Sequence, residues 1–128
     1  AVDEVQRAAR GLGSGAICPL EDQVLAMYIF DALIYNENRT RGRMLYDTRD
    51  WGLVLVEHDD AFATRTGRPR HLAEIPLVFS DGWERALRSL TDAVLAENLS
   101  DVLDRRRLNA LATRRDEILA EKAAAERR

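Results

Sequence analysis

Apolar residues are most concentrated between residues 21 and 35, where they occupy nearly every side of an expected helix. A helix that is apolar all round belongs inside a core rather than on a surface. We therefore expect Glu21–Tyr35 to be the most buried element, since each large side chain contributes about 1.5–3 kcal/mol when it is buried. Asp31 is the one acid in its middle. It lies either on a thin exposed stripe or in the interior, bonded to Arg39 or Arg41.

After residue 43 the pattern changes from helical spacing to short runs of β-forming residues. Met44–Tyr46 and Gly52–Glu57 contain aromatic or β-branched residues and are bounded by Asp, Arg and Gly, which predicts two strands. Asp47–Trp51 predicts a turn, because its short polar side chains can bond back to their own backbone. The polar loop Asn36–Arg43 precedes this hairpin, and the cluster Glu57–Asp60 follows it. We expect any chemistry of the protein in these two loops.

The segment that follows the hairpin is polar and basic. Ala63–Ala73 contains three arginines and a histidine, and Gly67 and Pro69 oppose regular structure in it. We expect a solvated surface loop here. The apolar run Ile75–Phe79 comes next, and we expect it to clamp the following helix against the core.

Three capped helices are predicted after residue 80. Asp81 and Glu84 form a capping box for the first, Thr91 or Asp92 opens the second, and Asp104 caps the third. Beyond residue 120 the third helix is polar on all sides, so we expect its end to fray or project. The inward stripes are expected to consist of Trp83, Ala86, Leu87 and Leu90, then Val94, Leu95 and Leu99, then Leu108, Leu111, Arg115, Ile118 and Lys122.

The first nineteen residues are expected to form a short helix, Val2–Arg10, and a Gly-rich linker. The linker sequence GLGSG is interpreted as a flexible connector, because a phosphate-binding loop needs a strand before it and Lys-Ser/Thr after it. Cys18 is interpreted as a small apolar filler. The N-terminal sequence has no basic region followed by an apolar one, so it is not interpreted as a signal peptide.

The composition is that of a folded chain, since 46% of the 128 residues are hydrophobic and 32% are charged. We predict a single domain with a helix and linker at 1–19, a helical body at 20–120 and a polar tail at 121–128. The predicted class is mainly α (α+β), with a buried central helix and one small β-hairpin. A single cysteine excludes an internal disulfide and fits a reducing, cytoplasmic compartment.

Neither nucleic acid nor a membrane is expected as a partner. The net charge of −3 and the pI near 5.4 give no attraction to phosphate-rich surfaces. No run approaches the roughly 18 apolar residues that span a bilayer. Arg105–Arg107 is interpreted as a solvated helix start, because no aromatic residues or wider basic face accompany it. Trp51 and Trp83 are interpreted as packing residues.

The two loops carry a recognisable pattern. Asn36–Arg43 reads NENRTRGR, and Leu55–Phe62, beyond the hairpin, reads LVEHDDAF. This order and spacing resembles the C-lobe of atypical kinases of the HipA, phosphatidylinositol-kinase and Golgi secretory types, in which a motif close to N-x-D-R-x-x-x-N precedes a hairpin and D-H/N-G-x-A-F. The resemblance covers most of residues 20–120. It implies a kinase C-lobe fold, with Ala63–Ala73 in the position of an activation segment.

The residues that carry the chemistry of those kinases are replaced. The resemblance puts Asn38 where the family has its catalytic Asp, Arg43 where it has a metal-binding Asn, and Glu57 where it has a metal-binding Asp. Phosphoryl transfer needs a carboxylate for the substrate hydroxyl and two side chains that hold Mg²⁺. Asn38 cannot accept a proton, and Arg43 is a permanent cation that repels Mg²⁺. Glu57 keeps a carboxylate that is able to bind a hard cation.

The cluster Glu57–Asp60 has two interpretations. Acids at a strand end suit a metal, with Glu57 and Asp59 as candidate ligands. Zinc is not expected, because it takes about four ligands and the chain has one Cys and two His. Alternatively, the cluster forms a turn and pairs with arginines of the preceding loop. Arg43 opposite Glu57 would then replace a metal site by an ion pair.

These inferences predict a non-catalytic, pseudokinase-like C-lobe module. It would bind a protein partner or a second copy of itself, through the hairpin loops or through apolar surface that an N-lobe would cover. No cofactor is expected. The first alternative is a C-terminal fragment of an active phosphotransferase whose N-lobe is outside this chain, and only this alternative needs Mg²⁺. The second is a structural helical domain without nucleotide chemistry.

Overall fold

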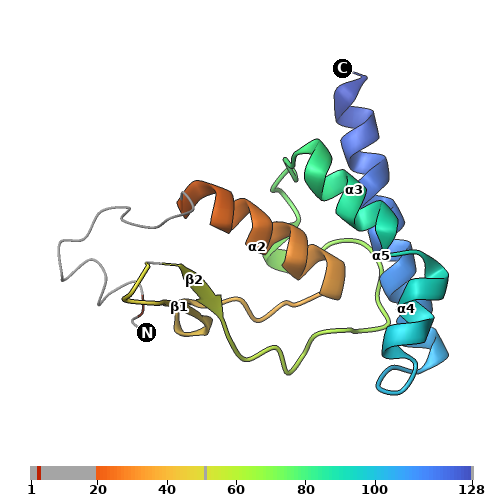
Figure 1. Ribbon diagram of the computed structural model, residues 1–128, viewed down its shortest axis with the longest axis horizontal. Helices are drawn as coiled ribbons and strands as arrows, with labels where there is room; N and C mark the ends of the chain where they lie inside the picture. The colour runs from red at the N-terminus through yellow and green to blue at the C-terminus, as the bar shows by residue number, and fades with distance from the viewer. Residues whose placement is uncertain (1–2, 4–19, 51, 128) are drawn as a thin grey trace.

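A computed structural model of the chain describes Asp3, residues 20–50 and residues 52–127 (Figure 1). Four α-helices and one two-stranded antiparallel sheet occur in this part, which confirms the mainly α (α+β) class. The predicted helix Val2–Arg10, the Gly-rich linker, Cys18 and Trp51 lie outside the described residues. In chain order the elements are α2 (Leu20–Ile34), η1 (Arg41–Arg43), β1 (Met44–Tyr46), β2 (Leu53–Leu55), η2 (Arg70–Leu72), α3 (Asp81–Ser89), α4 (Asp92–Leu99) and α5 (Arg105–Glu126).

The core forms where α2 meets the long helix α5, which also contacts α3 and α4 (Figure 1). The helix at residues 21–35 is therefore central, as its apolar pattern predicts, although it ends at Ile34 because Tyr35 has a positive φ of 54°. Among the described large apolar side chains of α2, that of Phe30 is the exposed one, at 37%. The buried cluster consists of Ile29, Ala32, Leu72, Leu77, Leu87 and Ile118.

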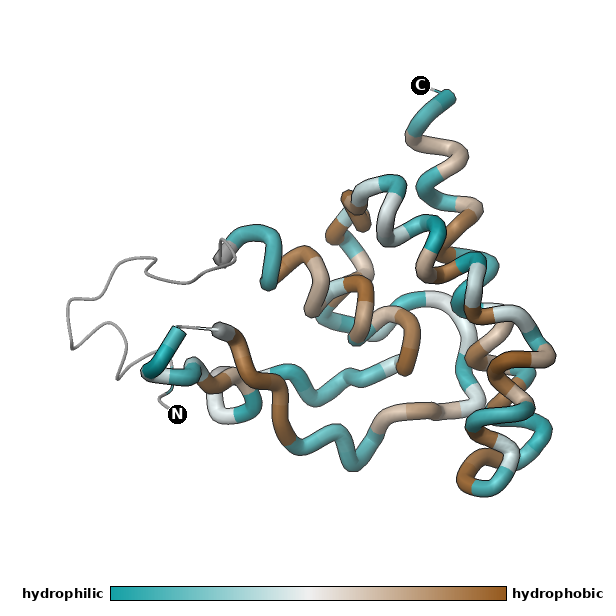
Figure 2. Tube along the Cα trace, viewed as in Figure 1, coloured by the Kyte–Doolittle hydropathy of each residue, from teal (hydrophilic) through white to brown (hydrophobic). Residues whose placement is uncertain are grey.

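The hairpin forms next to α2, with Met44 opposite Leu55 and Tyr46 opposite Leu53 (Figure 1). The predicted first strand is confirmed. The second is shorter than predicted, because Glu57 has a positive φ of 60° and turns the chain away. The tube in Figure 2 shows the apolar residues of β2 following one another beneath α2.

The predicted turn has the expected chemistry. The Asp47 carboxylate accepts a hydrogen bond from the Arg49 backbone N–H at 2.9 Å, and the Asp50 carboxylate accepts one from Gly52 at 2.8 Å. The Arg49 side chain also bonds Asp47, and this holds the pKa of the Asp47 carboxyl well below its usual range. Short acidic side chains therefore close this turn by bonding their own backbone.

Two of the three predicted helix caps are confirmed. Thr91 accepts from Val94 N, and Asp104 accepts from Arg107 N. The first prediction is wrong, because Ser80, one residue before Asp81, caps α3 through a bond from the Trp83 N–H. A hydroxyl placed immediately before the first helical residue serves as the cap just as a carboxylate would.

The predicted inward stripes are confirmed on α5 and only partly on α3. Leu87 is buried, but Trp83 and Ala86 are exposed, so the expected place of these two residues on an inward stripe is wrong. On α5, Lys122 is buried and the helix continues to Glu126, and its C-terminal end projects beyond α3, which is one of the two outcomes expected for the residues after 120 (Figure 1).

The segment predicted as a solvated loop after the hairpin contributes to the core. Pro69 is buried, and Leu72, at the end of η2, has no exposed surface. Residues 75–79 alternate, with Ile75, Leu77 and Phe79 against the core and Pro76 and Val78 exposed. The polar composition of this segment therefore gives no sign that Leu72 packs in the core. None of the described helices combines the length and apolar content needed to cross a membrane.

Candidate functional site

The loops on either side of the hairpin meet at the C-terminal end of α2. The Phe62 N–H donates to the Ile34 carbonyl at 2.6 Å, which joins the loop after β2 to the end of the helix. Tyr35, Glu57 and Phe62 all have positive φ, and they are the only non-glycine residues among those described that do. Such backbone costs of order 1–3 kcal/mol per residue and tends to occur where a site constrains the chain. The two loops predicted to carry chemistry are therefore neighbours.

Arg43 and Glu57 face each other across the base of the hairpin. Arg43 Nε donates to Glu57 Oε2 at 3.1 Å, and Arg43 Nη1 donates to the Asn38 carbonyl at 3.0 Å. All three positions singled out by the kinase resemblance thus come together around one guanidinium. The side chain of Glu57 is 61% exposed and that of Arg43 is 28% exposed. Solvent therefore reaches both groups, and the pair is not a shielded one.

The residues present do not fit Mg²⁺ at this position. A hard cation requires several oxygen ligands, and the guanidinium of Arg43 lies against the single carboxylate that faces it. Asp59, the other candidate ligand, is exposed and forms no ion pair within the described part of the chain. Asn38 offers an amide instead of a base. This arrangement holds two loops together, and Arg43 occupies the face of Glu57 that a metal would need.

Behind this pair lies a buried ion pair between α2 and the first loop. Arg39 donates from Nε to Asp31 Oδ2 at 3.0 Å and from Nη2 to Asp31 Oδ1 at 2.8 Å, and neither side chain is more than 2% exposed. Asn36 donates to the same carboxylate at 3.2 Å. Arg39 Nη1 donates to the Arg43 carbonyl at 2.8 Å. Of the two interpretations of Asp31, the buried acid bonded to Arg39 is therefore the correct one.

Both histidines of the chain border this ion pair. His58 Nε2 lies 3.1 Å from Arg39 Nη2, and its ring meets Phe30 edge to face at 5.4 Å. His71 Nε2 lies 3.5 Å from Asp31 Oδ2, yet neither of its buried ring nitrogens has a hydrogen-bond partner among the described residues. Nothing in the sequence marks His71 as a neighbour of Asp31, because it lies in a polar segment that predicts a surface loop.

Arg114 of α5 is a second residue that the pattern did not reveal. It is buried, and it donates to three carbonyls, those of Leu33, Ala63 and Arg65, at 2.7–2.9 Å. Burial lowers the pKa of its guanidinium. The side chain joins the end of α2 to the segment after the hairpin. An arginine in a charged helix carries no sequence signal for such a role, since most are solvated.

Three acidic side chains lie together where α3 meets the end of α5, and a lysine side chain already pairs with them. Asp81, Glu84 and Glu126 lie close enough to share an ion, but Lys122 Nζ pairs with all three. These contacts, with the Glu126 hydrogen bond the largest, raise the pKa of Lys122. The cluster fastens α3 to α5 and is structural.

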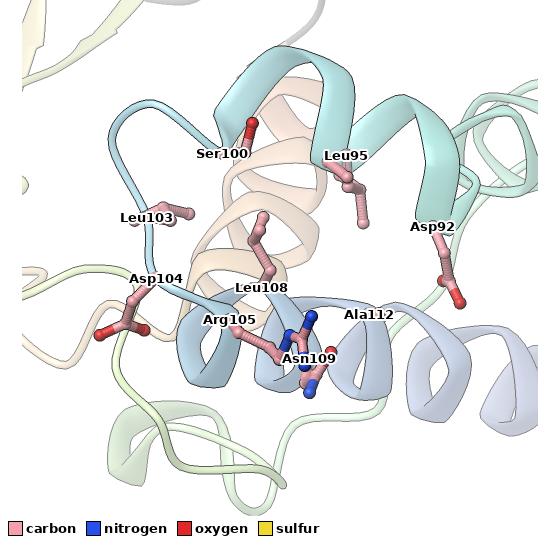
Figure 3. Close-up of a pocket in the computed structure, with 10 residues that line it drawn as sticks. Asp92, Leu95, Ser100, Leu103, Asp104, Arg105, Leu108, Asn109 and Ala112 are labelled. Carbon is pink, nitrogen blue, oxygen red and sulfur yellow. The ribbon is translucent and has the colours of Figure 1, made fainter.

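Two hollows show apolar surface. One, of about 460 Å³, is lined by residues of α2 and β2 together with two rings, namely Gln23, Ala26, Met27, Phe30, Leu53, Leu55, His58 and Trp83. The other, of about 470 Å³, lies between α4 and the start of α5. Figure 3 shows Leu95 and Leu108 pointing toward each other in it, with Asp92 and Asp104 at its ends. Both are open to solvent, and the first adjoins the site through His58.

No known protein family, no curated protein and no solved structure matches this chain.

Proposed function

We propose that this chain is a non-catalytic, pseudokinase-like C-lobe module that acts by binding a protein partner. The observation that supports the proposal best is the position of Arg43. Its guanidinium contacts the Glu57 carboxylate, which a nucleotide-bound metal would need, and the backbone carbonyl of Asn38, the residue in the position of the catalytic base. A fixed cation there opposes binding of Mg²⁺, and the amide of Asn38 cannot accept a proton in place of the family's Asp.

Partner binding is supported by the apolar hollow beside this site. Phe30 is 37% exposed and Trp83 is 40% exposed, and both line it. Exposed aromatic residues that gather around a concave surface are typical of binding sites for proteins, where Trp and Tyr contribute most of the affinity. A second copy of the chain is the alternative partner for the same surface.

One observation favours a second function. Glu57 retains a carboxylate at the end of the hairpin, and it is largely exposed. If an N-lobe outside this chain displaced Arg43, that carboxylate would become available to a metal, and the chain would be part of an active phosphotransferase. A purely structural helical domain is the third candidate.

The first experiment is calorimetric titration of the purified chain with ATP and Mg²⁺. We expect no saturable heat at a dissociation constant of about 1 mM or tighter, because only one of the required groups is present. The matched control is the Arg43→Asn/Glu57→Asp double variant, which restores two family residues. A saturable, Mg²⁺-dependent heat with the unaltered chain would refute the non-catalytic proposal in favour of the phosphotransferase one.

A further inference from the structure

A polar pocket of about 310 Å³ borders the same loops, and of the three positions used in the proposed function only Asn38 lines it. Its walls come from the end of α2, the loop after α2, and the segment beyond β2. The lining residues are Tyr35, Glu37, Asn38, Asp60, Ala63 and Arg65. Its size lies at the lower end of the range of about 300–1,000 Å³ that is usual for small-molecule sites, so it suits a small ligand.

Charges of both signs line this pocket without pairing. Glu37, Asp60 and Arg65 are exposed, and no side chain of the three forms an ion pair with a described residue. Acids and arginines that are neighbours elsewhere in the chain do pair, as Asp104 does with Arg107. The unpaired groups here remain available to a ligand that carries both charges.

A buried cation adjoins the same pocket. Arg114 is 1% exposed, and its Nη1 donates to the carbonyls of Ala63 and Arg65 at 2.9 and 2.7 Å. Its guanidinium carbon lies 5.8 Å from the centre of the Tyr35 ring. All three of these neighbours line the pocket.

Arg114 forms no direct ion pair with a described residue, and Glu117 is the carboxylate that acts on its charge. The guanidinium donates only to neutral carbonyls, and Nη2 is buried without a hydrogen-bond partner among the described residues. Orphaned buried donors are rare in folded proteins. Because screening is weak in the interior, this charge acts on the pocket more strongly than an exposed one would.

The backbone around the pocket is also constrained. Tyr35 has a φ of 54°, and Phe62, between Asp60 and Ala63, has a φ of 64°. An aromatic residue pays for this conformation, whereas glycine would not. Residues held in such conformations gather at ligand sites, so the strain supports a binding role that the charges indicate independently.

We infer that this pocket binds a small zwitterion of the α-amino-acid type. Its carboxylate would lie toward Arg65 and the field of Arg114, and its ammonium toward Glu37 and Asp60. The negative charges of two acids, Glu37 and Asp60, and the positive charges of two guanidinium groups, Arg65 and Arg114, sum to zero. That balance favours a ligand with separated charges over a simple anion or cation. The Asn38 side chain provides an additional donor and acceptor for the ligand.

The test uses three probes that differ in charge. L-Serine carries both charges, lactate lacks the ammonium, and ethanolamine lacks the carboxylate. Each is titrated into the isotopically labelled chain, and backbone amide shifts around residues 35–38 and 60–65 are followed by NMR. We expect saturable binding of L-serine, and affinities for lactate and ethanolamine at least about tenfold lower, because each omits one charge-assisted contact.

Variants of exposed residues separate binding from folding. Glu37→Gln and Asp60→Asn should each weaken L-serine about tenfold and leave lactate unchanged, while Arg65→Gln should weaken L-serine and lactate together. Glu97→Gln and Asp101→Asn are matched controls, because both residues are exposed and lie away from the pocket on α4 and after it. The controls should bind L-serine as the unaltered chain does.

Three results would overturn the inference. They are the absence of saturable L-serine shifts up to about 10 mM, equal affinity for L-serine and either of the other probes, and unchanged L-serine affinity in all three lining variants. None of these bears on ATP and Mg²⁺, so the zwitterion site and the non-catalytic proposal succeed or fail separately.

Discussion

Two arginine–carboxylate pairs hold the same loop, and they differ in almost everything except chemistry. Arg39 and Asp31 are 2% and 0% exposed and share two hydrogen bonds. Arg43 and Glu57 share one hydrogen bond, and the carboxylate is mainly in solvent. Only three residues separate Arg39 from Arg43, yet the first belongs to a buried pair and the second to an exposed one.

Burial decides how much each of these ion pairs contributes to stability. A buried pair is costly to break, because the remaining partner is left charged and unsolvated. An exposed pair contributes a median of about 0–1 kcal/mol, since water solvates both groups almost as well. We therefore assign the Asp31–Arg39 pair to the architecture of the loop and the Arg43–Glu57 pair to its chemistry.

The largest effect is expected when the buried pair is broken. Asp31→Ala should lower the free energy of unfolding by about 3–5 kcal/mol, because Arg39 would remain charged in the interior. Urea denaturation followed by circular dichroism measures this loss. The double variant Asp31→Leu/Arg39→Met is the control and should be less destabilised than Asp31→Ala alone. A loss below about 1 kcal/mol for Asp31→Ala would show that this pair contributes no more to stability than an exposed ion pair does.

A much smaller effect is expected at the exposed pair. Arg43→Ala, Glu57→Ala and their combination form a double-mutant cycle, and their coupling energy should be at most about 1 kcal/mol. Raising the salt concentration should abolish this coupling, since the Debye length falls to about 3 Å at 1 M. A coupling of about 3 kcal/mol or more that survives salt would show that this pair also supports the fold.

The smallest effect is expected at an exposed carboxylate that caps a helix. Hydrogen bonds from the Arg107 backbone, with its charge, lower the pKa of Asp104. A lowered pKa means that the stabilisation is complete above the unfolded value of about 3.9 and is lost as the pH falls through the folded value. The advantage of the unaltered chain over Asp104→Asn in thermal unfolding should therefore shrink from pH 6 to pH 3. An advantage independent of pH would exclude a role for the charge.

Sequence alone determined the elements whose stability is local. The apolar run on α2, the strand at residues 44–46, the acidic turn and the caps at Thr91 and Asp104 all follow from residues within one turn of each other. The pairing of Arg43 with Glu57 could also be expected, because a hairpin necessarily brings its two ends together.

Tertiary structure decided the contacts between distant segments. Nothing local marks Leu72 as core, places His71 beside Asp31, or directs Arg114 to carbonyls more than 45 residues away. A polar side chain has the same local pattern whether water or protein satisfies it. Burial, which sets the strength of its interactions, exists only once the segments have packed. That is the reason why the hairpin loops could be located from the sequence, whereas the burial of Asp31 with Arg39 stayed one of two open interpretations and the pocket could not be expected.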